Sequence, residues 1–375
     1  TFLRQAVPLA AALRAAGARP RVPAVVDCTT PRATLLAYVA TVLGGGLPVI
    51  TPVHLVSRLA GGARAAELQA TLGAACVVTD RPASGAGPWP EPGPAARLAV
   101  FDAVGIPAAA GVPPGLAPTV APGDPAHLQL TSGSTSSPKA AVVTHANVLA
   151  NCRALSGLVA MGAEDSVASW LPLYHDMGLV GMALLSLLQG TDLHLLSPFD
   201  FLAHPEDWLG AISTTWAAVT ASPTFGFQLA ATRTPDARRD QLDLSRLRIA
   251  GCGGEPVRAD VLAAFAERFA PCGLRSGVIR PCYGLAEATL AVTFNDGGHP
   301  PPLVRLTGVV LAPDGKVLLD DCGSLGADRG ARGADQVSQT VLVSAGSAVA
   351  DTEVVIVDPT TGQARPAEDL TGEVA

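Results

Sequence analysis

Between two short apolar segments lies the hydroxyl-rich stretch Thr131-Ser132-Gly133-Ser134-Thr135-Ser136-Ser137-Pro138-Lys139. The flanking residues, 127–130 and 140–143, are typical of β-strands, so the stretch is predicted to be a loop between them. Backbone N–H groups, hydroxyls and the ammonium of Lys139 together suit a polyphosphate. The loop differs from a Walker loop because no glycine immediately precedes Lys139 and no helix begins there. A serine-rich linker is the alternative, and the two apolar flanks disfavour it.

Apolar runs of strand and helix length alternate on both sides of this loop, which predicts an α/β fold with mostly parallel sheets. Helices are predicted for 1–17, 31–42, 146–159 and 178–190, and strands for 24–26, 47–50, 74–79, 98–101, 127–130, 140–143, 193–196, 217–221 and 248–250. We predict two α/β lobes, 1–125 and 126–293, and a smaller β-rich, barrel-like part over 294–375. The Pro-, Ala- and Gly-rich residues 81–122 are predicted to be a long surface connection.

The composition excludes several classes of protein. The 375 residues carry a net charge of −7, without the basic footprint that nucleic-acid binding requires. The most apolar window, 35–56, is interrupted by glycines and prolines, so no membrane span is expected. Seven cysteines without a CxxC pair favour a reduced, cytoplasmic protein over a secreted or zinc-binding one. The chain stops within an expected strand, and we expect it to be part of a longer protein.

Three further segments carry side chains suited to chemistry. They are Trp170-Leu171-Pro172-Leu173-Tyr174-His175-Asp176-Met177-Gly178, Cys252-Gly253-Gly254-Glu255-Pro256 and Tyr283-Gly284-Leu285-Ala286-Glu287-Ala288-Thr289. Adjacent glycines allow a backbone to approach a ligand closely, and a tyrosine ring offers a flat apolar face with a polar end. The other histidines show no metal-ligand spacing.

Together with the 131–139 stretch, these segments resemble the motifs of the adenylate-forming enzymes. The first stretch is similar to that family's phosphate-binding signature, T-S-G-S-T-G-x-P-K-G. The other three resemble its aromatic/His motif, its G-x-E-P adenine loop and its Y-G-x-T-E motif in the forms found in fatty acyl-AMP ligases. Ala345 lies 56 positions after Thr289, and this long span also resembles the insertion of that subgroup. The resemblance covers nearly the whole chain and implies the large N-terminal domain of an acyl-CoA synthetase or fatty acyl-AMP ligase.

The resemblance implies a two-step reaction. A small-molecule carboxylic acid attacks the α-phosphate of ATP and gives an acyl-adenylate (acyl-AMP), and a thiol of CoA or of a carrier protein's phosphopantetheine then takes the acyl group. The implied catalytic residues are Lys139, His175 and Glu287, of which Glu287 would bind Mg²⁺. The implied nucleotide-binding residues are Thr131, Ser132, Gly133, Ser134, Thr135, Gly253, Gly254, Glu255, Pro256, Tyr283, Gly284, Leu285 and Ala286. Tyr283 would stack on adenine, and His175 would lie near the acyl carboxylate.

The acyl pocket implied by the resemblance is lined by Tyr174, Met177, Ser222, Thr224, Phe225 and Phe227. For Met177 and the two phenylalanines, an ordinary place in the hydrophobic core is an equal alternative. For Glu287, the alternative is a solvated carboxylate at the start of a helix. The acyl group itself is not specified by the sequence.

Two features depart from the family pattern. Ser136 and Ala140 stand where the signature has glycine, and a side chain there could strain the backbone or meet the phosphate. The ribose-binding Asp, the hinge and the catalytic Lys of the family's small C-terminal domain are absent from the chain, so the resemblance implies poor adenylation by this chain alone.

Three hypotheses therefore stay open. The first is an acyl-activating ligase that uses ATP. The second is an enzyme that only forms thioesters from acyl-AMP supplied by a partner, because its phosphate loop is altered. The third is a non-catalytic binding domain.

Overall fold

The computed structural model describes residues 2–52, 73–74, 76–80, 99–102, 115, 118–131, 139–162, 164–297, 301–306, 319–324, 340–357, 361, 363–364 and 373–374. The predicted connection over 81–122 and most of the hydroxyl-rich stretch lie largely outside these residues.

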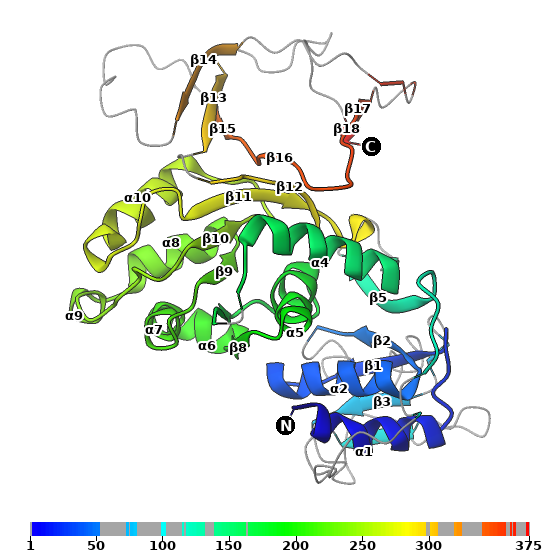
Figure 1. The fold of residues 1–375 in the computed structure, drawn as a ribbon. Coiled ribbons are helices and arrows are strands. Elements are labelled where there is room, and N and C mark those ends of the chain that lie inside the picture. The colour runs from blue at the N-terminus through cyan, green and yellow to red at the C-terminus, as the bar shows by residue number, and fades with distance from the viewer. Residues whose placement is uncertain are drawn as a thin grey trace, which may run out of the picture. The chain divides into compact units, whose positions relative to one another are not determined.

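Helices and strands alternate through most of the chain (Figure 1). The α-helices are α1 (Phe2–Ala15), α2 (Pro31–Gly44), α4 (His145–Val159), α5 (Leu185–Gln189), α6 (Pro198–Ala203), α7 (Glu206–Thr214), α8 (Thr224–Arg233), α9 (Asp236–Arg239) and α10 (Ala259–Phe269). A π-helix, η1, spans Met177–Leu184, and 3₁₀ turns span Ala270–Cys272 (η2) and Ala286–Ala288 (η3).

The strands are β1 (Pro23–Asp27), β2 (Leu47–Ile50), β3 (Cys76–Thr79), β4 (Ala99–Asp102), β5 (Pro125–Thr131), β6 (Lys139–Thr144), β7 (Ser166–Ser169), β8 (Asp192–Leu195), β9 (Val219–Ser222), β10 (Ile249–Cys252), β11 (Ile279–Gly284), β12 (Ala291–Phe294), β13 (Pro302–Leu306), β14 (Leu319–Ser324), β15 (Thr340–Val343), β16 (Ser347–Ala348), β17 (Ile356–Val357) and β18 (Glu373–Val374).

The chain divides into two compact units, each described here by itself. The first contains Thr1–Cys152, Trp170–Leu184 and Leu195–Pro198, and the second contains Arg153–Ser169, Leu185–His194 and Phe199–Ala375. The predicted three-part division at residues 125 and 293 stays a prediction.

The first unit is built on a sheet with the strand order β4-β3-β1-β2-β5-β6. Its described pairings are parallel, except that β5 and β6 form an antiparallel hairpin. The helix α2 follows β1 and begins where the hydroxyl of Thr30 accepts a hydrogen bond from the backbone N–H of Ala33. It ends at Gly45, whose φ of +84° is the left-handed conformation that glycine adopts without strain.

The second unit is built on a sheet with the strand order β16-β12-β11-β10-β9-β7-β8. The strands β7, β9, β10 and β11 are parallel to one another, whereas β12 pairs antiparallel with both β11 and β16. Aromatic rings fill its core: Trp208 of α7 packs edge-on against Phe227 of α8, which packs edge-on against Phe265 of α10. Each of these three rings is at most 1% exposed. The helices α7, α8 and α10 are thereby joined through one close-packed aromatic core.

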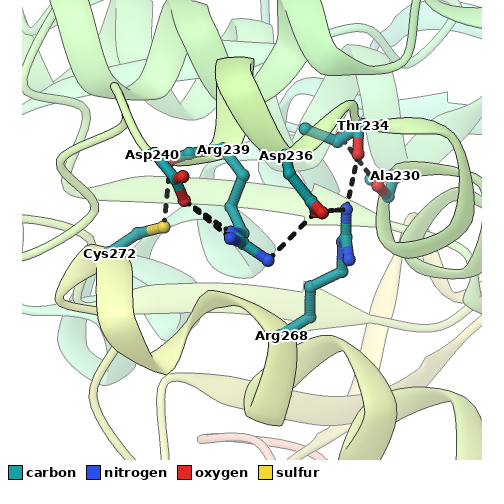
Figure 2. Close-up of polar contacts among 7 residues, drawn as sticks. All are labelled: Ala230, Thr234, Asp236, Arg239, Asp240, Arg268 and Cys272. Carbon is teal, nitrogen blue, oxygen red and sulfur yellow. Dashed lines mark hydrogen bonds and ion pairs between the residues drawn. The ribbon is translucent and has the colours of Figure 1, made fainter.

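A polar network connects α9 to α10 and to the 3₁₀ turn η2 (Figure 2). Oδ1 of Asp236 lies 2.9 Å from Nη2 of Arg268 and 3.1 Å from Nη1 of Arg239. The same Arg268 nitrogen donates to the carbonyl of Thr234, and the thiol of Cys272 donates to the carbonyl of Arg239. The network fixes the chain between α8 and α10, which lie side by side (Figure 1).

The predicted fold class is confirmed: the fold is mixed α/β with mostly parallel sheets. The helix predicted for 178–190 differs in kind. Its first part, Met177–Leu184, is a π-helix, and only Leu185–Gln189 is α-helical. Gly178, near the start of the π-helix, packs so closely that a Cβ there would overlap the carbonyl oxygen of Pro172. After Phe294 the described elements are all strands. No helix in the described part of the chain is long and apolar enough to cross a membrane.

Candidate functional site

The two ends of the predicted phosphate loop face each other across the β5–β6 hairpin. Thr131 and Lys139 are paired residues of the ladder, and the Thr131 hydroxyl donates to the Lys139 carbonyl at 3.3 Å. The side chain of Lys139 is exposed and available to an anionic ligand. The loop between them, including Ser132, Gly133, Ser134 and Thr135, lies outside the described residues.

Ala140 causes no backbone strain. It pairs with Leu130 within the regular part of β6, and it is absent from the described non-glycine residues with positive φ. The glycine of the family signature is therefore not needed for backbone conformation at this position. Ser136, the other departure, lies outside the described residues.

The histidine segment is fixed by three polar contacts. Nε2 of Gln129, in β5, donates to the carbonyl of Tyr174 at 2.6 Å. Nδ1 of His175 lies 2.6 Å from Oδ1 of Asp176, whose carboxylate also accepts the backbone N–H of Met177 at 2.7 Å. Burial raises the pKa of Tyr174. The segment thus connects directly to the strand that ends at Thr131.

The pKa of His175 is raised from its ordinary value of 6.5. The hydrogen bond to Asp176 is the largest cause, burial opposes it, and the negative charge of Asp176 adds to it. The imidazole side chain is 49% exposed, whereas that of Asp176 is 9% exposed. Nδ1 is bound to Asp176, so Nε2 is the nitrogen that could contact the acyl carboxylate, and that contact stays a prediction.

In the second unit, the start of α8 is joined to the glycine loop that follows β10. The Thr224 hydroxyl donates to the Pro256 carbonyl at 3.3 Å and lies 3.6 Å from Sγ of Cys252. The backbone N–H of Phe225 donates to Oε1 of Glu255 at 2.6 Å. Sequence alone assigned residues 222–227 (the acyl segment) and residues 252–256 (the glycine loop) to different parts of the ligand. In the structure these two segments are directly connected.

Glu255 occupies the position of a helix cap. Pro223 precedes α8 and has no side chain that could accept a helix N–H, so the carboxylate of Glu255 takes that role. A negative charge at a helix N-terminus is also favourable to the helix dipole. The carboxylate itself therefore acts on α8, and binding of a nucleotide by the loop backbone at Gly253 and Gly254 stays a prediction.

Gly253 is required by close packing. A Cβ at this position would lie 2.7 Å from the carbonyl oxygen of Cys282 and 2.9 Å from its Sγ, so β10 and β11 could not keep their spacing. Gly254 has a φ of +80°, which side chains rarely tolerate. The loop can bend at this point only because both residues are glycine.

Tyr283 lies next to this loop, at the end of β11, and is 40% exposed. Its neighbour Gly284 packs against the carbonyl of Leu290 with no room for a Cβ. The N–H of Leu285 donates to that same carbonyl, which closes the turn that carries Ala286 and Glu287. Tyr283 is therefore an accessible residue of a closely packed hairpin, and its stacking on adenine stays a prediction.

Glu287 is exposed in the 3₁₀ turn η3. The turn ends at Thr289, which is 5% exposed and has a φ of +74° and ψ of −52°, a strained conformation for a β-branched residue. Such strain concentrates at functional sites.

The residues present fit a Mg²⁺ ion held mainly by its substrate. Among the described residues, no group of three or more His, Cys, Asp or Glu is placed to hold a metal ion. A single accessible carboxylate, Glu287, together with phosphate oxygens and water is the donor set that Mg²⁺ commonly uses in nucleotide sites.

The predicted acyl-pocket residues differ in exposure. Phe225 is 39% exposed at the start of α8, whereas Phe227 has no exposed surface and belongs to the aromatic core. Ser222 and Thr224 are at most 3% exposed, and Met177 is 7% exposed. The roles of all six residues in a substrate pocket stay predictions.

The predicted site residues form two groups. Thr131, Lys139 and the segment from Tyr174 to Met177 belong to the first unit, whereas the acyl segment, the glycine loop and the Tyr283 hairpin belong to the second. That both groups border a single cleft stays a prediction. Sequence reasoning overlooked Gln129 and Asp176 as positioning residues. Asp176 could have been found from the sequence, because it directly follows His175.

Comparison with known proteins agrees with the motifs. The family model described as AMP-binding enzyme matches residues 1–375. The chain is 39% identical over 239 residues to 4-hydroxyphenylalkanoate adenylyltransferase of Mycobacterium marinum, covering 62% of this chain and 36% of the relative. It is 34% identical over 242 residues to the medium-chain-fatty-acid–[acyl-carrier-protein] ligase TtuA of Teredinibacter turnerae, covering 64% of this chain and 36% of the relative.

A solved structure also matches. The fatty acyl-adenylate ligase from L. pneumophila, in complex with acyl adenylate and pyrophosphate, aligns with a TM-score of 0.80 and 28% identity over 96% of this chain and 60% of that one. The chain spans just over a third of the length of the two curated relatives. The resemblance stated from the four motifs is confirmed, and the chain belongs to the AMP-binding enzyme family.

Proposed function

We propose that this chain is the nucleotide- and acyl-binding part of an AMP-forming acid–thiol ligase. The observation that carries the proposal is the connection between the acyl segment and the glycine loop, made by Phe225 with Glu255 and by Thr224 with Pro256. A ligand that joins an acyl group to a nucleotide needs its two binding segments in one fixed arrangement. The family match and the acyl adenylate bound by the L. pneumophila ligase also support this proposal.

The first step is attack of a carboxylate oxygen on the α-phosphate of ATP, which forms the acyl–phosphate bond and releases pyrophosphate. This step needs charge neutralisation and in-line positioning more than a covalent protein intermediate. Lys139 would neutralise the β and γ phosphates, and Nε2 of His175 would hold the acyl carboxylate. Tyr283 would stack on adenine, and Glu287 would hold a Mg²⁺ ion, which offsets phosphate charge.

In the second step, a thiol sulfur attacks the acyl carbon and AMP leaves with the electron pair of the broken bond. The names of the relatives point to a fatty or arylalkanoic acid as substrate and to a carrier protein's phosphopantetheine as acceptor. CoA is the alternative acceptor, and a cytoplasmic location would give access to either thiol.

A second candidate is a thioester-forming enzyme that receives acyl-AMP from a partner. Ser136 favours it, because a side chain in place of glycine can displace a phosphate. Ala140 does not favour it, because its backbone is an ordinary strand. ATP–pyrophosphate exchange by the full-length protein would exclude this candidate, and failure to bind acyl-AMP at all would favour a non-catalytic domain.

The direct test is calorimetric binding of a non-hydrolysable acyl-AMP analogue to this chain. We expect binding by the wild type and a loss of about tenfold or more in Tyr283→Ala, since base–aromatic stacking contributes about 1–3 kcal/mol. Tyr38→Phe, which alters a buried tyrosine in the first unit, is the control. Absence of binding by folded wild type would contradict the proposal.

A further inference from the structure

A pocket of about 310 Å³ opens at the amino ends of β10 and β11. Arg248 immediately precedes β10, and Arg280 is the second residue of β11. Because these strands are parallel, Gly253 and Tyr283 lie at their other ends. The pocket therefore belongs to the opposite edge of the sheet from the nucleotide site.

Three guanidinium groups line this pocket: those of Arg248, Arg275 and Arg280. Arg248 is fixed by structural contacts. Its Nη2 lies 2.5 Å from Oδ2 of Asp165, and its Nη1 donates to the carbonyls of Val159 and Ala160 at the end of α4. These contacts neutralise the negative end of that helix, so the α4 carbonyls do not repel an anion from the pocket.

Unlike Arg248, Arg280 has a hydrogen-bond donor that no described residue satisfies. Its Nε is buried and has no hydrogen-bond partner among the described residues. Burial, with the positive charge of Arg248 adding to it, lowers the pKa of Arg280, and the charge of Asp296 opposes the shift. The Arg280 side chain is only partly buried, but its buried and unused Nε donor is destabilising unless an acceptor reaches it.

Arg275 supplies a free charge at the mouth of the pocket. It is exposed, and within the described residues it makes no ion pair or hydrogen bond. It is followed by Ser276, whose hydroxyl is a further donor, and by Gly277, which adopts a φ of +77°. The carboxylates that face these arginines are Asp165, which is bound to Arg248, and Asp296, which acts on Arg280.

We propose that this pocket binds the phosphate group of a small phosphorylated molecule, held between Arg275 and Arg280. A phosphate dianion presents enough acceptors for two planar guanidinium forks. The volume lies at the lower end of the range of small-molecule pockets, so it admits a phosphate with a short organic substituent. The site is separate from the nucleotide site and does not depend on the proposed ligase activity.

The test is a calorimetric titration of this chain with inorganic phosphate. A titration with sodium chloride at equal ionic strength is the reference. Because the 131–139 loop can also bind phosphate, the same titration is made on Lys139→Ala. We expect Lys139→Ala to retain phosphate binding, and Arg275→Gln and Arg280→Gln to weaken it about tenfold or more, as the loss of a charge-assisted fork predicts.

The matched control is Arg153→Gln, which removes one exposed positive charge from α4 outside the pocket lining and should change the affinity less than twofold, about 0.4 kcal/mol. Arg275 is exposed, so its variant stays informative if Arg280→Gln fails to fold. Glycerol 3-phosphate, tested in parallel, distinguishes a phosphomonoester from free phosphate as the ligand. Wild-type affinity in Arg275→Gln, or loss of all phosphate binding in Lys139→Ala, would overturn the proposal.

Discussion

The backbone N–H of Phe225 donates a 2.6 Å hydrogen bond to the carboxylate of Glu255, thirty residues further along the chain. Through this bond the loop that follows β10 holds the first turn of α8. The position of the acyl segment (residues 222–227) therefore depends on Glu255 of the glycine loop. A change at Glu255 should affect both segments.

Glu255→Ala is expected to lower the free energy of unfolding by about 1 kcal/mol, the usual loss when a helix cap is removed. The same variant should bind an acyl-AMP analogue more weakly, because α8 is no longer fixed to the loop. Urea denaturation and calorimetry measure the two effects. Glu164→Ala, an exposed carboxylate of the same unit, is the control. Unchanged stability and affinity in Glu255→Ala would refute the capping role.

The pair His175–Asp176 predicts a pH dependence of stability. Because the pKa of His175 is raised in the folded state, protonation favours folding. This contribution is fully present below the ordinary value of 6.5 and is lost as the pH rises through the raised folded value. Asp176→Asn should therefore be more destabilising at acidic than at alkaline pH. The Asn oxygen can still accept the N–H of Met177.

Urea denaturation across the pH range measures this difference, and NMR titration of His175 should show its pKa falling in Asp176→Asn. Glu206→Gln, next to the exposed His204, removes a comparable carboxylate and should show a smaller pH dependence. A constant stability difference between wild type and Asp176→Asn at all pH values would show that the pair does not raise the pKa.

Gly253→Ala tests the close approach of β10 and β11. The added Cβ meets backbone at 2.7 Å, so we expect a loss of about 1–3 kcal/mol in stability, as for other overpacked sites. Gly157→Ala, in α4 with open space around the new Cβ, should instead stabilise the protein by up to about 1 kcal/mol. Thermal unfolding compares the two, and equal effects would argue against the packing account.

The sequence predicted the strands that are short apolar runs bounded by turn residues, as in Ala24-Val25-Val26, but it missed β7, β11 and β12. It predicted a helix over 178–190 but not that Met177–Leu184 is a π-helix, because apolar periodicity does not distinguish the two helix types. It identified Glu255 as a site residue but not as a helix cap, since the two partners are far apart in sequence. Local patterns reveal residue type and periodicity, whereas contacts such as Gln129 with Tyr174 depend on how the elements pack.

We propose that the loop ending at Lys139 and the hairpin carrying Tyr283 bind one nucleotide ester. Calorimetry of Lys139→Ala with ATP and with a non-hydrolysable acyl-AMP analogue tests it most directly. Lys139→Ala should weaken ATP binding by tenfold or more, about 1.4 kcal/mol, and leave acyl-AMP binding nearly unchanged, because the adenylate has no β or γ phosphate. Equal losses for both ligands, or no loss for either, would contradict the claim.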